Sequence, residues 1–292
     1  GLLLLRDALD TRLRGTDDLA RASDLPVLAE FPEQTGMRRL PREASSYLRT
    51  NLLFLSADAH PKILLVTSDN SAQGKSSVAM SLAESFARNE HRTLLIDADL
   101  RKPVLGREFG LDPLKHSSLR SHLEDPLQAP EPAQVHIDKG VVLDVIPSFE
   151  PAPDPTELLS RGFRRLLQAQ ADAYDVIVID SAPILAVADT LAIAPFSTGT
   201  ILVTNVQQTD RKQVRTTVDL LRRIGVRILG TVATNVRGPG RSNTYGYGYG
   251  PAVPDQPATS ESFARADHSP QLRLTSHRGA APIRRSRHDP RG

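Results

Sequence analysis

The triplet Gly74-Lys75-Ser76 is the part of the sequence with the most recognisable chemistry. It joins a short apolar run, Ile63–Thr67, to a segment over Lys75–Ala87 whose apolar residues recur with helical spacing. At such a junction, backbone N–H groups at the helix start bind phosphate, a lysine reaches the β- and γ-phosphates, and a serine hydroxyl binds Mg²⁺. The triplet therefore predicts a phosphate-binding loop for a nucleotide, although Asp69 replaces the first glycine of the usual motif.

Carboxylates follow two further apolar runs of the same kind. Asp97 and Asp99 come after one run, and Asp180 comes directly after the other. Ligands of open parallel sheets bind outside the carboxyl ends of the strands, so these three side chains are expected to meet Lys75 around one magnesium-bound nucleotide. The alternative is that each aspartate only caps the helix that follows it.

The elements that must position these residues form an alternating pattern. The predicted strands are residues 63–67, 93–97, 141–146, 176–179, 201–205 and 228–234, and the predicted helices are 42–55, 75–87, 156–171 and 211–224. Strands that are apolar throughout and separated by helices indicate a mostly parallel sheet with helices on both faces. The expected fold class is α/β.

Three regions are predicted along the chain. Residues 1–40 are expected to be a linker, because glycines and prolines interrupt any long periodicity. This linker would lie next to a membrane if Gly1–Leu5 is the end of a transmembrane helix. Residues 41–236 form the nucleotide-binding domain. Residues 237–292 have few large apolar side chains and are expected to be disordered. The opening Gly1–Leu5 is either the start of a helix or the remaining end of a transmembrane helix.

Composition excludes several classes of site. The 292 residues include no cysteine, which rules out disulfides, thiolate-bound zinc and a cysteine nucleophile. A net charge of only +2 gives no reason to expect a nucleic-acid partner. No run of about 20 apolar residues is present to span a membrane.

Three of the five tyrosines, Tyr245, Tyr247 and Tyr249, alternate with glycine at the start of the predicted tail. They form either a low-complexity aromatic patch or, given the nucleotide motifs, a cluster of phosphate acceptors. The tail carries nine arginines against four acidic residues. Because each phosphotyrosine adds about −1.5 to −2 charges, three of them would cancel this excess and are hypothesised to weaken docking of the tail in an acidic neighbouring site. Beyond residue 251 the basic tail is either a solvated linker or a segment attracted to an anionic membrane.

The sequence resembles the bacterial tyrosine kinases (BY-kinases) that partner polysaccharide chain-length regulators. The resemblance is carried by the loop at 68–76, by the hydrophobic-Asp-x-Asp-x-Arg order of Leu94–Arg101 and by Asp180. That family shares its P-loop NTPase fold with the MinD/ParA ATPases. The resemblance covers roughly residues 40–250. It includes the landmarks Leu143–Pro147, Asp154–Leu159, Tyr174-Asp175 and Gly230–Asn235.

The resemblance implies an ATP- and Mg²⁺-dependent tyrosine autokinase that phosphorylates its own tyrosine cluster, between subunits, and regulates capsule or exopolysaccharide synthesis and export. It implies a position at the cytoplasmic face of the plasma membrane. The expected partners are further copies of the chain, in a homo-oligomer such as a ring, and a transmembrane chain-length regulator or an N-terminal portion of the same protein.

The resemblance also implies roles for individual residues. Asp97 is expected to act as the base for the tyrosine hydroxyl, and Arg101 to position phosphates or a neighbouring subunit. The expected metal ligands are Ser76, Asp99 and Asp180, and the expected nucleotide contacts are Ser71, Ala72, Gln73, Gly74, Lys75, Ser76, Ser77 and Asn235. Which aspartate is the base and which binds the metal stays open at this point.

The sequence departs from the family pattern in three places. Ala72 replaces a glycine of the loop, which is expected to weaken nucleotide binding at most, and Ser181-Ala182-Pro183 replaces Thr-Pro-Pro. Ser46 replaces the middle arginine of the contact motif that spans Glu43–Arg49, which puts ring assembly in doubt. Two alternatives therefore remain: a MinD/ParA-like ATPase switch, whose signature lysine is absent from residues 69–71, and a nucleotide-binding scaffold with little catalysis.

Overall fold

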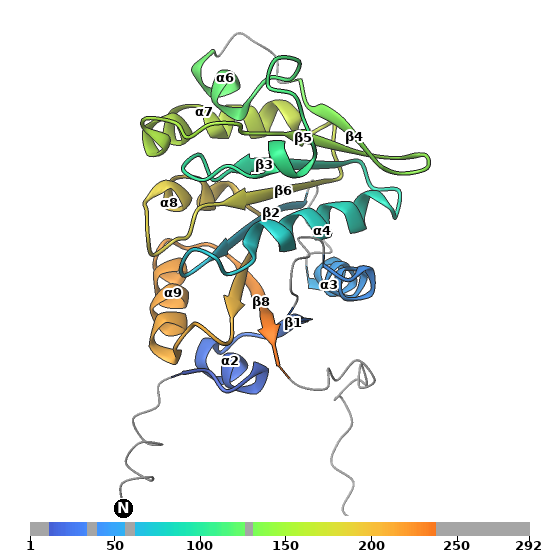
Figure 1. The fold of residues 1–292 in the computed structure, drawn as a ribbon. Helices are drawn as coiled ribbons and strands as arrows, with labels where there is room; N and C mark the ends of the chain where they lie inside the picture. Colours follow the sequence, from blue (N-terminus) through green and yellow to red (C-terminus); the bar gives the residue numbers. More distant parts are fainter. Residues whose placement is uncertain (1–11, 34–39, 56–61, 126–130, 238–292) are drawn as a thin grey trace, which may run out of the picture. The chain divides into compact units, whose positions relative to one another are not determined.

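The computed structural model describes residues 12–33, 40–55, 62–125 and 131–237. Within these ranges, eight strands form one sheet in the order β1-β8-β7-β2-β6-β3-β5-β4 (Figure 1). The strands are β1 (Val27–Pro32), β2 (Lys62–Ser68), β3 (Thr93–Ala98), β4 (Ala133–Asp138), β5 (Val141–Ile146), β6 (Val176–Ser181), β7 (Gly199–Asn205) and β8 (Ile228–Val236). All neighbouring pairs are parallel except β4 with β5. The predicted α/β class with a mostly parallel sheet is thus confirmed.

Helices cover both faces of this sheet. They are α2 (Thr16–Ser23), α3 (Arg42–Leu55), α4 (Lys75–Ala87), α5 (Leu105–Glu108), α6 (Leu119–Glu124), α7 (Pro155–Gln170), α8 (Asp189–Ile193), the 3₁₀ turn η1 (Ala194–Phe196) and α9 (Arg211–Arg223). Helices α3 and α4 pack on one face, while α6 and α7 pack on the other. Every strand and helix predicted from the sequence is present, with ends shifted by at most two residues.

Side chains of the central strands alternate between the two faces. In β6, Val176 and Val178 join the cluster under α4, whereas Ile177 and Ile179 join the cluster under α7. Successive side chains of a strand point to opposite faces of the sheet. Because helices cover both faces here, runs of consecutive residues in the central strands are apolar.

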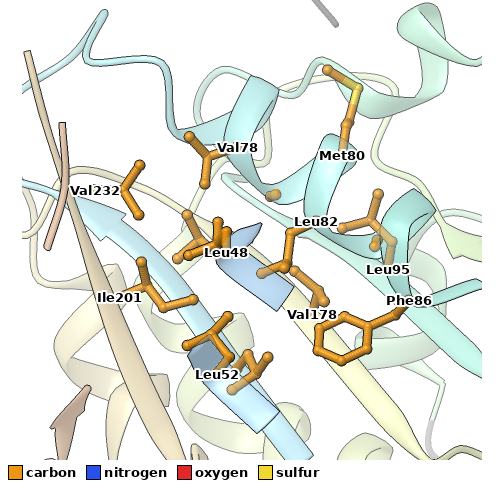
Figure 2. Packing of buried hydrophobic residues seen from close by; sticks show 14 of the residues in the cluster. Leu48, Leu52, Val78, Met80, Leu82, Phe86, Leu95, Val178, Ile201 and Val232 are labelled. Atoms are coloured by element: carbon orange, nitrogen blue, oxygen red, sulfur yellow. The ribbon is translucent and has the colours of Figure 1, made fainter. Parts of the chain in front are cut away.

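Helix α4, which follows the phosphate-binding loop, is held tightly by its surroundings. Eleven of its residues are buried, and Val78, Leu82 and Phe86 pack toward Val178 of the sheet (Figure 2). Leu48 and Leu52 of α3 belong to the same cluster. Burial of one such large side chain contributes about 1.5–3 kcal/mol, so the start of α4 is a firmly fixed point.

The expectation that residues 1–40 are only a linker is wrong for part of that segment. Helix α2 packs near α9, and β1 pairs in parallel with β8 at the edge of the sheet. The prolines that suggested a break flank β1 or lie at its end, where an edge strand tolerates them. The pairing depends on Gly230, because a Cβ there would lie 2.6 Å from the carbonyl oxygen of Pro26. Residues 1–11, including the leucine run, lie outside the described residues.

Strand β4 was also missed by the sequence pattern. It pairs antiparallel with β5 at the opposite edge, and most of its residues are only partly covered, so its sequence lacks a continuous apolar run. The described residues belong to one unit, Gly1–Tyr245. The tail predicted to be disordered spans residues 237–292, and all of it after Arg237 lies outside the described residues. Within the described segments, no helix combines the length and apolar character that a bilayer crossing requires.

Candidate active site

The loop between β2 and α4 opens onto a cavity of about 280 Å³. Gly74 caps the start of α4 with a left-handed backbone (φ +88°), a conformation that glycine adopts without strain. The Lys75 side chain is buried, and its ammonium points to the acidic cluster described below. The cavity is lined by Ala72, Gly74, Lys75, Ser76, Ser77, Met80, Val104, Arg107 and Glu108.

Gln73 fixes this loop to the ends of two neighbouring strands. Its buried Oε1 accepts hydrogen bonds from the backbone N–H of Asn205, at 2.5 Å, and from the hydroxyl of Thr209, at 3.2 Å. Its carbonyl oxygen accepts a third from Thr234, at 2.8 Å. The Gln73 side chain therefore points into the protein, so a nucleotide contact by this residue would come from its backbone N–H.

Ala72 has the left-handed backbone conformation that its position requires. Its φ angle is +62°, and its side chain is exposed. A residue with a Cβ pays a steric cost of about 1–2 kcal/mol in this region, which glycine avoids. An alanine at a position where the family usually has glycine therefore places strain in the loop.

The predicted aspartates meet at the ends of β3 and β6. Asp97 and Asp180 lie opposite each other in the ladder, and both side chains are fully buried. Asp99 follows β3, and its Oδ2 lies 3.8 Å from the Nζ of Lys75. The three aspartates and the lysine thus form one buried cluster next to the phosphate-binding loop.

Asp180 has the electrostatic character of a cation ligand. Neither of its oxygens accepts a hydrogen bond from any residue that the structure describes. Burial raises the pKa of Asp180 to about 6, while the positive charge of Lys75 acts in the opposite direction. A buried, unpaired carboxylate is unfavourable unless a positive charge compensates it. A divalent cation at this point would supply that charge.

Asp97 is held by the start of α5. Its Oδ2 accepts hydrogen bonds from the backbone N–H groups of Val104, at 3.0 Å, and Leu105, at 2.9 Å. Complete burial, reinforced by the nearby charge of Asp180, raises the pKa of Asp97 well above its usual range. A carboxylate with raised proton affinity suits a proton acceptor.

The donor set fits Mg²⁺ bound together with a nucleotide. Within the described ranges, no three histidine or acidic side chains converge in a way that could hold a metal alone. Mg²⁺ usually takes one or two carboxylates and completes its shell with phosphate oxygens and water. The unpartnered oxygens of Asp180 and the buried ammonium of Lys75 are consistent with such a shared site.

Arg101 and Asn235 are among the predicted site residues that do not line this cavity. Arg101 is paired with the fully buried Asp189, through Nε to Oδ2 at 2.7 Å and through a second hydrogen bond at 3.0 Å. It therefore ties the segment after β3 to the start of α8. Asn235 lies at the end of β8, where its carbonyl oxygen accepts a hydrogen bond from Gln207. The three tail tyrosines lie outside the described residues.

Sequence reasoning missed the residues that α5 contributes. Val104, Arg107 and Glu108 line the cavity opposite the loop, although none of them belongs to a recognised motif. The available signal was weak: a basic residue in a short polar segment soon after the Asp-x-Asp-x-Arg element. Only the fold shows that this segment turns back over the phosphate-binding loop.

Comparisons with known proteins identify relatives of this chain. A family model described as "ParA: NUBPL iron-transfer P-loop NTPase" matches residues 60–239. The tyrosine-protein kinase YwqD of Bacillus subtilis is 34% identical over 214 residues, which cover 73% of this chain and 88% of YwqD. The putative tyrosine-protein kinase EpsB of Ralstonia solanacearum is 33% identical over 84% of this chain but only 30% of EpsB.

A solved structure gives the same result at the level of the fold. The kinase domain of the Escherichia coli tyrosine kinase ETK superposes with a TM-score of 0.66 at 26% identity, over 80% of this chain and 99% of that domain. The resemblance inferred from the motifs is thus confirmed by relatives that match most of the chain. The chain belongs to the bacterial tyrosine-protein kinases, which are built here on a ParA-like P-loop NTPase fold.

Proposed function

We propose that this chain transfers the γ-phosphoryl group of ATP to the tyrosines of its own C-terminal segment, Tyr245, Tyr247 and Tyr249. The observation that carries the proposal is the buried cluster of Lys75, Asp97, Asp99 and Asp180 beside the phosphate-binding loop. Phosphoryl transfer depends mainly on positioning and charge neutralisation, and this cluster supplies both.

We assign a role to each residue of the site, and the positions described above support these assignments. The Lys75 ammonium and the N–H groups at the start of α4 bind the phosphates, with the loop residues 71–77 around them. Ser76, Asp99 and Asp180 would hold Mg²⁺, which neutralises phosphate charge when bound. The phenol oxygen forms a bond to the γ-phosphorus as the bond to the bridging oxygen of ADP breaks. The phenol proton passes to Asp97.

Arg101 has a positioning role in this proposal. Its pair with Asp189 fixes the segment that follows Asp99, and Asp189 also accepts a hydrogen bond from Thr156 of α7. The side of the sheet formed by β7 and β8, where Asn235 lies, is assigned to the base and sugar of the nucleotide.

The wider setting is also proposed. The acceptor segment is supplied by another copy of the chain, and the protein works at the cytoplasmic face of the plasma membrane with a transmembrane chain-length regulator, which is encoded separately or as part of the same protein. Such an arrangement would regulate capsule or exopolysaccharide production. The proposal is supported by membership of the tyrosine-protein kinases and by larger relatives such as EpsB, of which the matched region is only 30%.

The direct test is incubation of the chain with Mg-ATP, followed by phosphopeptide mass spectrometry. Phosphate on any of the three tail tyrosines supports the proposal, hydrolysis without labelling supports an ATPase switch, and binding alone supports a scaffold. Lys75→Met should abolish labelling, because it removes the charge that holds the phosphates. A Lys75→Met protein that still labels itself would show that the assigned site is not the source of the activity.

A further inference from the structure

A second cavity of about 570 Å³ lies next to the nucleotide cavity, and Arg107 lines both. Its lining combines apolar side chains with two arginines and one glutamate. The residues that matter here are Pro103, Arg107, Leu111, Arg120, Phe149 and Glu150, which we call the α5 groove.

The groove lies on the side of the site that holds Asp97, the proposed base. Phe149 and Glu150 follow β5, which is the neighbour of β3, and β3 carries Asp97. Ser148 of the same segment donates a hydrogen bond to the Asp97 carbonyl oxygen, at 2.9 Å. A chain bound in the groove can therefore extend past Arg107 into the phosphate cavity.

The groove is held in shape by close packing under α5. A Cβ placed on Gly106 would lie 2.7 Å from the ring of Phe149, so glycine allows α5 to lie directly on that ring. The two arginines are less constrained. Arg120 pairs with Glu124 at 2.8 Å and Arg107 approaches Glu108 at 3.6 Å, and all but Glu108 have side chains at least 42% exposed. Pairs of this kind contribute about 0–1 kcal/mol, so a stronger anion can displace them.

The chemistry of the groove fits a phosphorylated tyrosine. The guanidinium group binds phosphate oxygens through two parallel hydrogen bonds, and the apolar lining suits an aromatic ring. A phosphotyrosine carries about −1.5 to −2 charges, which complements the two arginines. The hypothesis of weakened docking after phosphorylation assumed an acidic site, whereas this groove carries an excess of positive charge.

The Gly–Tyr segment 245–250 has the spacing that such a groove could use. An extended chain places residues two apart on the same face and about 7 Å from one another. A phosphotyrosine held by the arginines would then bring the next tyrosine of the series toward the phosphate cavity. The intervening glycines carry no side chain that would keep the backbone away from the groove.

The average reach of the chain's own tail is shorter than the distance to the groove, which is why a second copy is proposed as its source. The groove lies five strands from β8, which corresponds to about 24 Å across the sheet. Tyr245 is eight residues beyond Arg237, and a flexible chain of that length spans about 16 Å on average.

We propose that the α5 groove binds a phosphorylated tyrosine of the 245–250 segment of a second copy, so that one phosphorylation favours the next. This inference rests on the proposed function. The groove acts as a positioning and specificity surface for the acceptor. Arg120 can be tested alone because, unlike Arg107, it does not line the phosphate cavity.

The binding test uses synthetic peptides of residues 242–250, unmodified or phosphorylated at Tyr247, with a fluorescent label and no nucleotide. By anisotropy, the phosphorylated peptide should bind the full chain about fivefold more tightly than the unmodified one. Arg120→Gln should remove most of that difference. Arg161→Gln is the matched control, because Arg161 also forms an exposed ion pair one helical turn away, with Glu157, but lines no part of the groove.

The kinetic test uses the full chain with all three tail tyrosines changed to Phe, so that only the added peptide is labelled. The phosphorylated peptide should have the lower KM, by a similar factor, and Arg120→Gln should raise that KM more than it lowers kcat. Equal affinity for both peptides, or equal behaviour of the Arg120 and Arg161 variants, would overturn the inference. If neither peptide is labelled with Mg-ATP, the proposed function itself fails, and the anisotropy data remain a separate measurement.

Discussion

Restoring glycine at position 72 tests how much strain the phosphate-binding loop stores. Ala72 has φ +62° and an exposed side chain, so Ala72→Gly removes a steric cost of about 1–2 kcal/mol without creating a cavity. Glycine also makes the unfolded chain more flexible, which costs about 0.4–1 kcal/mol. The net expectation is a stabilisation of about 0.5–1 kcal/mol, equivalent to a rise in Tm of about 1–4 °C for a domain of this size.

The same substitution in a helix should have the opposite sign. Ala20 lies inside α2 and is not among the residues with positive φ, so Ala20→Gly is expected to destabilise the protein by about 1 kcal/mol. Both variants can be compared with the parent protein by urea unfolding and by calorimetry. If Ala72→Gly were neutral, or destabilising like Ala20→Gly, the loop would not be strained and the argument from its backbone angle would be refuted.

Three further predictions concern the single residues Asp97, His122 and Gly230. Asp97→Asn should reduce tyrosine labelling at least about tenfold, because general-base assistance contributes about 10²–10⁴ in rate. The Kd for Mg-ADP should change less than threefold, because Asp97 is not assigned to the phosphates. Equal losses of labelling and of Mg-ADP affinity would place Asp97 in nucleotide binding instead. Burial lowers the pKa of His122, whose ring nitrogens have no hydrogen-bond partner among the described residues. The neutral His122 ring therefore contributes stability above the unfolded pKa of about 6.5, and this contribution is lost as the pH falls below that value. The free energy of unfolding should drop between pH 7.5 and 5 by more in the parent protein than in His122→Leu. Equal drops in the two proteins would count against this assignment. Gly230→Ala should destabilise the protein by at least about 2 kcal/mol in urea unfolding, because its Cβ would meet the Pro26 carbonyl; unchanged stability would mean that β1 shifts freely.

The central part of the fold was predictable because its signals are local. The runs that became β2, β3 and β6 are apolar on both faces, which only a sheet covered on both sides requires. The aspartates at their ends could be placed together for the same reason. Parallel strands bring their carboxyl ends to one edge, and this rule needs no knowledge of the loops.

The parts that sequence reasoning missed depend on distant partners. The role of Gln73 comes from Asn205 and Thr209, more than 130 residues away, and the partner of Arg101 is 88 residues away. No spacing rule connects such residues. Strand β1 was missed because its flanking prolines looked like breaks, although an edge strand does not need every N–H group for pairing.

The parallel pairing of β1 with β8 has a practical consequence for shortened forms of the protein. A chain that began at residue 41, where the kinase domain was predicted to start, would lack Leu28 and Phe31, both of which are buried. It would also expose the backbone N–H and C=O groups along one side of β8, which would become an edge strand. Exposed edge strands pair with strands of other molecules and so promote self-association. A soluble fragment should therefore retain the whole of residues 12–33, so that β1 remains paired with β8.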